Sequence, residues 1–307
     1  MTLRALITGA EGFVGRALTA YLRRRNWDVV CAALRGLPGA VACDITRPEQ
    51  VRAALKQAGN LTHVFHLAAV AHLPEAAQQP VTTFHVNLAG VIHLTDALRE
   101  LAPKARLVYI GSAGAYGVPR SLPVTEEHPL SPNDPYAVSK AAADHYCAYC
   151  STALGMDVVR VRPFNHSGPG QDPRFVLPAF ARQIAEIEAE LAPPRVRVGN
   201  LETKRDFLHV NDVVRAYELL ALRGESGAAY NVCSGKAQSI RAALEALCAR
   251  VAVPITIESD PARIRRVDVP EICGSHEKLT RDTGWTPEIP FAQLLNDLLE
   301  RWRAAGA

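Results

Sequence analysis

The chain has 307 residues, enough to form a nucleotide-binding domain with a smaller partner domain. Hydrophobic residues make up 48% of it, charged residues 21%, and 34 basic residues nearly balance 31 acidic ones. The basic residues are scattered, which argues against a nucleic-acid partner. The sequence has no apolar run of membrane-spanning length and no signal-peptide pattern, so we expect a cytoplasmic protein without a membrane partner.

The seven cysteines show no paired spacing of the kind that metal sites use, so no metal is predicted. Cys147 and Cys150 form a CxxC sequence inside an expected helix. A redox-active pair belongs at a helix N-terminus, because the helix dipole lowers the thiol pKa there. We therefore interpret this pair as buried, inert thiols.

The N-terminal segment has the order strand, glycine turn, helix. An apolar strand at residues 3–8 leads into Gly9-Ala10-Glu11-Gly12-Phe13-Val14-Gly15 and a helix that reaches about residue 25. Gly9 permits the tight turn, Gly12 lets backbone N–H groups approach a pyrophosphate, and Gly15 allows the helix to pack closely on the strand. The turn, with Phe13 and Val14 at the helix start, is predicted to bind a dinucleotide.

The second strand, residues 28–33, is expected to end beside the adenosine ribose of that cofactor. An NAD-preferring site usually has an acid here for the 2′-hydroxyl, but the sequence reads Ala32-Ala33-Leu34-Arg35. NADP(H) is therefore favoured, with NAD(H) as the alternative. Arg35 is the candidate partner of a 2′-phosphate, and an exposed loop arginine is the other interpretation.

Two further segments are predicted to line the cofactor. Asp44, followed by Ile45, precedes a helix at residues 48–57, and its carboxylate either accepts from the adenine amino group or caps the helix. The next strand, residues 62–66, ends in Leu67-Ala68-Ala69, whose small alanines leave room for the cofactor.

Two polar residues near these segments are interpreted as structural. His66 belongs to the strand at residues 62–66 and is expected to be a packed core histidine. Asn87 lies in a long predicted helix at residues 81–100, and we assign it no chemical role.

The chemistry is predicted to lie after the next strand, residues 105–110. Ser112 follows its carboxyl end, where open α/β sheets bind ligands. A proline-rich stretch, residues 119–135, is expected to be a surface loop before a helix that reaches about residue 154. Tyr136 and Lys140 are one turn apart on that helix. A nearby ammonium lowers a tyrosine pKa, so Tyr136 is predicted to exchange a proton near neutral pH.

These motifs together resemble the extended short-chain dehydrogenase/reductase family of nucleotide-sugar epimerases, dehydratases and reductases. The resemblance implies an α/β fold: a Rossmann domain with a doubly wound parallel sheet at residues 1–165, rejoined by about 206–234. It also implies a smaller C-terminal α/β domain at residues 166–307 that binds the nucleotide sugar. Relatives commonly dimerise through two long helices, here near residues 81–100 and 135–154, so a homodimer is expected.

The resemblance also implies roles for single residues. Tyr136 is the proton donor or acceptor, and Ser112 binds the reacting oxygen. Lys140 holds the nicotinamide ribose and lowers the tyrosine pKa. Pro163, after a strand predicted at residues 157–162, is a further candidate cofactor contact.

The second half of the chain resembles the reductases of the family that act on a GDP-linked sugar. The stretches 162–171, 198–202, 205–207 and 231–235 resemble those that convert GDP-4-keto-6-deoxy-D-mannose to GDP-D-rhamnose. This implies a GDP-sugar substrate.

Arginine forks suit the diphosphate of such a substrate, and Arg205 and Arg265 are the candidates. A salt bridge with Asp206 or Asp212 is the alternative for Arg205. At the second position the neighbours Arg263 and Arg266 compete with Arg265.

Asn165 is a candidate donor to sugar or phosphate oxygens, or a loop-stabilising amide. His166, beside it, is assigned no role.

Residues that related enzymes have and this chain lacks limit the choice of reaction. Related 4,6-dehydratases have an Asp-Glu pair where this chain has Ala113 and Gly114, and related fucose synthases have Cys and His where it has Gly114 and Gly170. Hydride transfer alone remains. A 4-epimerase with retained NAD, a reductase of opposite facial selectivity that gives GDP-6-deoxy-D-talose, and a cofactor-binding regulator without catalysis are the alternatives.

Overall fold

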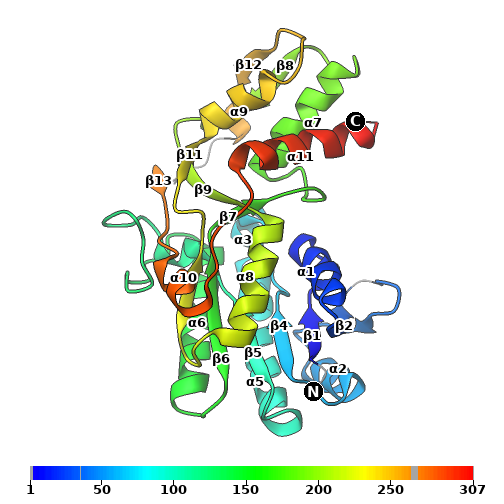
Figure 1. The fold of residues 1–307 in the computed structure, drawn as a ribbon, viewed down its shortest axis with the longest axis vertical. Coiled ribbons are helices and arrows are strands. Elements are labelled where there is room, and N and C mark those ends of the chain that lie inside the picture. The colour runs from blue at the N-terminus through cyan, green and yellow to red at the C-terminus, as the bar shows by residue number, and fades with distance from the viewer. Residues whose placement is uncertain (1–2, 35, 264–268, 307) are drawn as a thin grey trace.

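The computed structural model describes residues 3–34, 36–263 and 269–306. A large lower part contains a seven-stranded parallel sheet with the order β10-β6-β5-β4-β1-β2-β3, and a smaller part lies above it (Figure 1). The strands are β1 (Arg4–Thr8), β2 (Asp28–Ala33), β3 (Val41–Ala42), β4 (His63–His66), β5 (Arg106–Ile110), β6 (Val158–Pro163) and β10 (Ala229–Val232). The α/β Rossmann-like class predicted from the sequence is confirmed.

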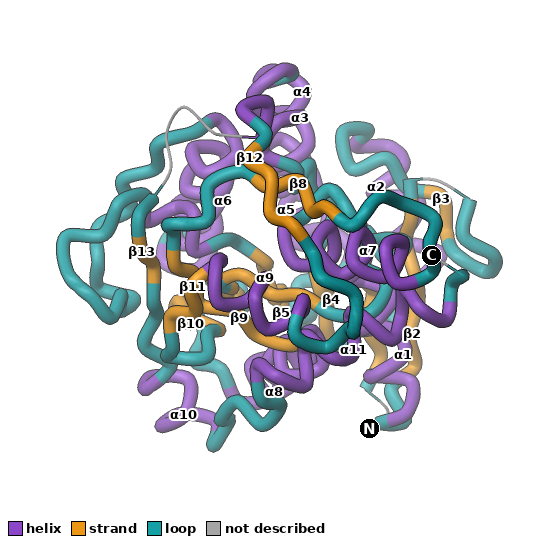
Figure 2. Tube along the Cα trace, turned by 90° about the horizontal axis from the view of Figure 1, so that it is seen from above, coloured by secondary structure: helices purple, strands orange, loops and turns teal. Residues whose placement is uncertain are grey.

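Helices cover both faces of this sheet (Figure 2). Along β5, Leu107 and Tyr109 point into one apolar core, whereas Val108 points into the other. Side chains alternate between faces along a strand, so each strand contributes to both cores, and its sequence is continuously apolar. The first face is covered by α2 (Pro48–Ala58), α5 (Gly90–Leu101) and α6 (Pro135–Thr152), and the second by α1 (Phe13–Arg24) and α8 (Val210–Arg223).

The strand order changes direction between β1 and β4. The chain moves from β1 outward to β2 and β3, then crosses back so that β4 pairs with the other side of β1. In open parallel sheets, the crevice beyond the carboxyl ends of the strands at such a switch point is where ligands bind. The switch point therefore gives the place for a dinucleotide.

The upper part is built around a smaller sheet and three helices. In this sheet β9 pairs with β7, β11 and β13, and a separate pair is formed by β8 and β12. The strands are β7 (Asn165–Ser167), β8 (Arg195–Val198), β9 (Lys204–His209), β11 (Ala237–Ser239), β12 (Thr256–Ser259) and β13 (Glu271–Ile272). An apolar core of its own joins α7 (Val176–Glu188), α9 (Ile240–Cys248) and α11 (Phe291–Ala304).

The chain returns to the lower part twice. First, β10 and α8 complete the large sheet and its helix layer, as the predicted return at residues 206–234 requires. Later, α10 (Glu277–Thr283) packs near α8, and the buried Trp285 donates from its indole to the Asp212 carbonyl at 3.1 Å. The second return was not predicted, and the division into two domains stays a prediction.

Two segments differ from the expected pattern. The predicted helix at residues 81–100 consists of α4 (Pro80–Phe84), a π-helical turn (His85–Ala89) and α5. The predicted surface loop at residues 119–135 is anchored in the interior: Val124 is fully buried and exchanges backbone hydrogen bonds with residues 273 and 275. Proline content indicated the absence of regular structure correctly, but it carries no information on these long-range contacts.

No helix among the described residues is long and apolar enough to cross a membrane. Cys147 and Cys150 are free and buried, which confirms their interpretation as buried thiols.

Candidate active site

Tyr136 and Lys140 lie in the first two turns of α6. Asp134 caps this helix, since its Oδ1 accepts a hydrogen bond from the Ala137 N–H at 2.8 Å, and Pro135 takes the first helical position. Both are strong helix-start signals. The helix start places the tyrosine and the lysine four residues apart on one face, as the sequence predicts.

Lys140 is held from two sides by the strand β5. Its Nζ donates to the Ile110 carbonyl at 2.8 Å and lies 5.4 Å from the centre of the Tyr109 ring, a cation–π contact. The Tyr109 hydroxyl in turn donates to the backbone carbonyl of Lys140 at 3.2 Å. The lysine is only 4% exposed, and burial lowers its pKa to about 8.

Ser112 and Tyr136 are brought together. Ser112 caps a short 3-10 helix (Ala113–Tyr116), where its Oγ accepts from the Gly114 N–H at 3.0 Å. A hydrogen bond from Ser112 opposes the effect of burial on Tyr136, but burial dominates and the tyrosine pKa is raised. The predicted lowering of the Tyr136 pKa is therefore wrong. The physical reason is the burial of the phenol, while the Lys140 ammonium is directed at the Ile110 carbonyl.

Asn87 connects the start of α6 to the segment after β4. Its amide donates to Ser139 Oγ at 2.9 Å and exchanges hydrogen bonds with the backbone N–H and carbonyl of Val70. Ser139 Oγ in turn donates to the Tyr136 carbonyl at 2.7 Å. These contacts agree with a structural role, and they tie the turn that holds Tyr136 to the switch point of the sheet.

The glycine turn fits the sequence argument at two positions. Gly9 has φ +68°, and a Cβ there would lie 2.8 Å from the backbone of Ala68. At Gly15 a Cβ would lie 2.2 Å from the Gly9 carbonyl oxygen, so only glycine allows α1 to approach β1 this closely. Gly12 precedes α1 without a side-chain cap, which leaves the helix N-terminus open for an anion.

The strand end next to this turn is fixed by His66. Its Nδ1 bonds Thr8 Oγ1 at 2.8 Å, and the backbone N–H of Leu67 donates to the Thr8 carbonyl at 3.2 Å. Burial, with a contribution from the charge of Lys140, lowers the His66 pKa to about 3. The prediction of a packed core histidine is confirmed. Ala69 directly follows Ala68 in this segment.

At the end of the site predicted to face the adenosine, Asp44 forms a turn with Thr46. Its Oδ1 accepts from the N–H and the hydroxyl of Thr46, at 2.9 and 2.7 Å, and the hydroxyl contact is the main cause of its lowered pKa. Ile45 is buried and packs against Gly90 of α5. Arg35 lies outside the described residues.

Near the other end of the site, Phe13 stacks on His166, with ring centroids 6.5 Å apart and planes 9° from parallel. Val14, next to Phe13, is half-buried. Pro163 is buried at the end of β6, opposite Val232 of β10. Of these three predicted cofactor contacts, Phe13 meets the smaller sheet, because His166 belongs to β7.

The predicted substrate residues lie on neighbouring strands of the smaller sheet. Asn165 begins β7 and is exposed opposite Phe207 of β9. Arg205, on β9, is half-buried and donates to the carbonyls of Lys204 and Val269 at 2.9 and 2.7 Å. Arg265 lies outside the described residues.

The salt bridges proposed as an alternative for Arg205 are not formed. Asp206 accepts from Ser234 and from the N–H groups of residues 235 and 274, while Asp212 pairs with Arg215. Both acids and Arg205 belong to the described part of the chain.

Comparison with known proteins assigns the family. Residues 5–233 match the sequence profile of the NAD dependent epimerase/dehydratase family. This chain belongs to that family. The match covers the glycine turn, Ser112, Tyr136 and Lys140, but not α9, α10 and α11.

Individual relatives extend over the whole chain. The GDP-6-deoxy-D-mannose reductase of Pseudomonas aeruginosa PAO1 is 39% identical over 99% of this chain and 98% of its own. The GDP-6-deoxy-D-talose 4-dehydrogenase of Aggregatibacter actinomycetemcomitans is 28% identical over 92% of each chain. Among solved structures, that of RMD from Pseudomonas aeruginosa complexed with NADPH has a TM-score of 0.90 and 38% identity, and covers 99% of this chain and 100% of its own.

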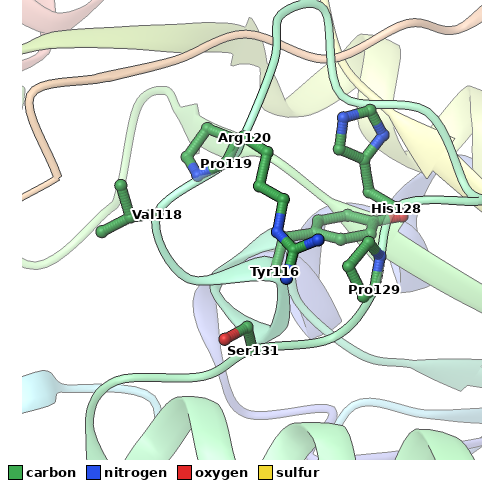
Figure 3. A pocket seen from close by; sticks show the side chains of 7 residues that line it. All are labelled: Tyr116, Val118, Pro119, Arg120, His128, Pro129 and Ser131. Carbon is green, nitrogen blue, oxygen red and sulfur yellow. The ribbon is translucent and has the colours of Figure 1, made fainter.

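A small cavity of about 40 Å³ lies between Tyr116 and the anchored loop (Figure 3). Arg120 and His128 extend beside the ring of Tyr116 there. Ligand pockets typically have volumes of about 300–1,000 Å³, so this cavity is too small for a nucleotide sugar. Tyr116 is instead part of a buried network, since its hydroxyl donates to Asn231 at 2.8 Å and accepts from Arg162 at 2.9 Å.

The sequence interpretation missed two side chains of the site. Tyr109 is expected only as a strand residue, yet its ring contacts the Lys140 ammonium and its hydroxyl donates to the Lys140 carbonyl. Glu11 is assigned no role by the sequence, yet its carboxylate accepts a hydrogen bond from the backbone N–H of Leu34. An acid between the turn glycines is a signal that could have been followed, whereas no local pattern marks Tyr109.

Proposed function

We propose that this protein reduces the C4 keto group of GDP-4-keto-6-deoxy-D-mannose to GDP-D-rhamnose with NAD(P)H. The observation that carries the proposal is the 39% identity to GDP-6-deoxy-D-mannose reductase along the full chain. The pairing of Ser112 with Tyr136 supports it, because a carbonyl reduction needs a proton donor and a hydrogen-bond donor at the same oxygen.

Tyr136 is suited to act as an acid. Burial raises its pKa, so the phenol keeps its proton at neutral pH and can donate it to the C4 oxygen as negative charge develops there. Ser112 donates a hydrogen bond to the same oxygen and stabilises that charge. Gly114 beside them leaves room, since a Cβ at this position would lie 3.2 Å from Ser112 Oγ and 4.0 Å from the Tyr136 ring.

Lys140 stabilises the phenolate that remains after proton transfer. Its pKa of about 8 keeps most of the ammonium charged at neutral pH. The contacts with Ile110 and Tyr109 hold the side chain close to its working position before ligands bind. Less reorganisation is then needed during the reaction.

The residues of the glycine turn fit a dinucleotide. The open N-terminus of α1 and the two positions where only glycine is accommodated form a backbone cradle for a pyrophosphate. We assign cofactor contacts to Gly9, Gly12, Phe13, Val14, Gly15, Asp44, Ile45, Leu67, Ala68, Ala69, Tyr136, Lys140 and Pro163. When bound, the reduced nicotinamide supplies the hydride.

Asn165 and Arg205 are proposed to bind the GDP-sugar, together with Arg265. Asn165 is exposed, and the neighbouring strand carries Arg205. A guanidinium matches the geometry of phosphate oxygens. We also propose a cytoplasmic homodimer that pairs through α4, α5 and α6, where Val81 and Tyr149 are exposed.

A single assay tests the reaction. The protein is incubated with GDP-4-keto-6-deoxy-D-mannose and NADPH or NADH, and cofactor oxidation is measured against sugar reduced. The proposal predicts one cofactor oxidised per sugar. Absence of oxidation with both cofactors contradicts it, and an epimerase with retained NAD gives that result. GDP-6-deoxy-D-talose as product would assign the opposite facial selectivity, which the similarity to the talose 4-dehydrogenase keeps as a second candidate.

A further inference from the structure

The adenosine end of the cofactor site contains an acid that the proposed reaction does not use. Glu11 lies within the glycine turn between β1 and α1. Its Oε1 accepts a hydrogen bond from the N–H of Leu34, the residue after β2, at 2.9 Å. The carboxylate thus joins the glycine turn to the tip of the strand that, in this kind of sheet, faces the adenosine ribose.

The other oxygen of this carboxylate is unsatisfied. Glu11 Oε2 is buried and has no hydrogen-bond partner among residues 3–34, 36–263 and 269–306. Buried carboxylate oxygens are normally paired, and leaving one unpaired is unfavourable. A hydroxyl donor brought by a ligand would satisfy it after a small rotation of the side chain.

Cys43, directly after β3, lies within range of the charges of Glu11 and of a second acid, Asp44. The Cys43 pKa is raised to about 11, mainly by burial, and the charges of Asp44 and Glu11 add to this rise. Two negative charges therefore act on the segment after β3, and that of Asp44 is partly offset by Arg47, 4.0 Å away. Such a field favours a neutral hydroxyl over a phosphate.

We infer that Glu11 is a specificity-determining residue of the cofactor site, which accepts a hydrogen bond from the ribose 2′-hydroxyl and repels a 2′-phosphate. Dinucleotide sites commonly have such an acid after the second strand. Here that strand ends in Ala33, and Glu11 reaches the same place from the neighbouring turn. Its effect opposes that of Arg35, the predicted phosphate partner. The inference rests on the proposed function only in that a nicotinamide dinucleotide binds.

Cofactor binding without sugar substrate tests the role of Glu11. Dissociation constants of NADH and NADPH are measured by calorimetry for the wild type, Glu11→Gln and Glu49→Gln. The glutamine at position 11 keeps an oxygen for the Leu34 N–H but removes the charge. Glu49 is an exposed acid in the first turn of α2 and controls for a general loss of negative charge.

We expect the ratio of the NADPH to the NADH dissociation constant to fall about tenfold in Glu11→Gln and to stay unchanged in Glu49→Gln. An unchanged ratio in Glu11→Gln overturns the inference, as does equal weakening of both cofactors. If Glu11→Gln does not fold, Glu11→Ala is used with the same expectation. Wild-type protein that binds neither cofactor overturns the proposed function as well, whereas binding with an unchanged ratio leaves the proposed function intact.

Discussion

Lys140 is proposed to act in the reaction and Arg205 in substrate binding, and the two cations are held differently. Lys140 is 4% exposed and held from the large sheet by Ile110 and Tyr109. Arg205 is half-buried on a short strand of the smaller sheet and contacts the backbone carbonyl of Val269.

This difference suggests that the large sheet carries the residues of the chemical step and the smaller sheet those that bind the substrate. Residues fixed in the large sheet and α6 are expected to act on the transition state, so their loss should lower kcat. Residues on the smaller sheet are expected to bind the substrate in the ground state and the transition state alike, so their loss should raise KM.

The largest expected effect is that of Tyr136→Phe. Removal of the proton donor should lower kcat by about 10²–10⁴-fold, while the dissociation constant of the cofactor stays near that of the wild type. Steady-state kinetics and calorimetry measure the two quantities. Tyr149→Phe is the matched control, because Tyr149 lies on the same helix and is 49% exposed. Wild-type turnover in Tyr136→Phe would refute the assignment of the acid.

Arg205→Gln tests the other half of the comparison. Loss of a charged fork from a diphosphate site should raise KM for the GDP-sugar on the order of 10–100-fold with little change in kcat. Arg197→Gln, at an exposed position of β8, serves as the control. A drop in kcat with an unchanged KM would show that Arg205 acts on the chemical step and would break the proposed separation.

The pH dependence follows from Lys140. Since its pKa is lowered to about 8, the ammonium is lost above that pH, and kcat/KM should fall about tenfold per pH unit there. In the unfolded chain the lysine pKa is about 10.4, so between pH 8 and pH 10 the unfolded chain binds more protons than the folded protein. The free energy of unfolding should therefore rise with pH in this range. Urea unfolding between pH 8 and pH 10 separates these effects: a parallel loss of activity and stability would contradict this explanation.

The smallest expected effect is that of Tyr109→Phe. This change removes the hydrogen bond to the Lys140 carbonyl and keeps the ring beside the ammonium. We expect the free energy of unfolding to fall by about 1 kcal/mol and kcat to fall about threefold. The pH profile of kcat/KM is measured as well. A shift of its alkaline limb would show that Tyr109 positions Lys140, which a general loss of stability would not do. An unchanged limb together with unchanged kcat would remove Tyr109 from the site.

Local sequence patterns predict much of the large sheet and little of what joins it to the rest. The strand predicted at residues 28–33 is β2 to the residue, and the helix predicted at 48–57 extends by one residue. Both depend on neighbouring residues, namely apolar runs, a proline at a helix start and the glycine spacing. The π-helical turn at residues 85–89 departs from the predicted regular helix, and Asn87 within it bonds to the distant Val70 and Ser139.

In the site, too, local patterns do not predict the contacts between residues distant in the sequence. The spacing of Tyr136 and Lys140 predicts a shared helix face, but the direction of the tyrosine pKa depends on burial and on which carbonyl binds the ammonium. Those contacts join residues about 30 positions apart in the sequence. The same holds for Glu11 and Leu34, 23 positions apart, which meet only after β1 and β2 have paired.

The central claim is that this protein performs a net reduction at C4 of a GDP-linked keto sugar. The most direct measurement uses GDP-4-keto-6-deoxy-D-mannose and NAD(P)H that carries deuterium at the transferable position, followed by NMR of the product. The account predicts GDP-D-rhamnose with one deuterium at C4 and one equivalent of oxidised cofactor. A product without deuterium at C4, or an unreduced sugar with the cofactor unchanged, would contradict it.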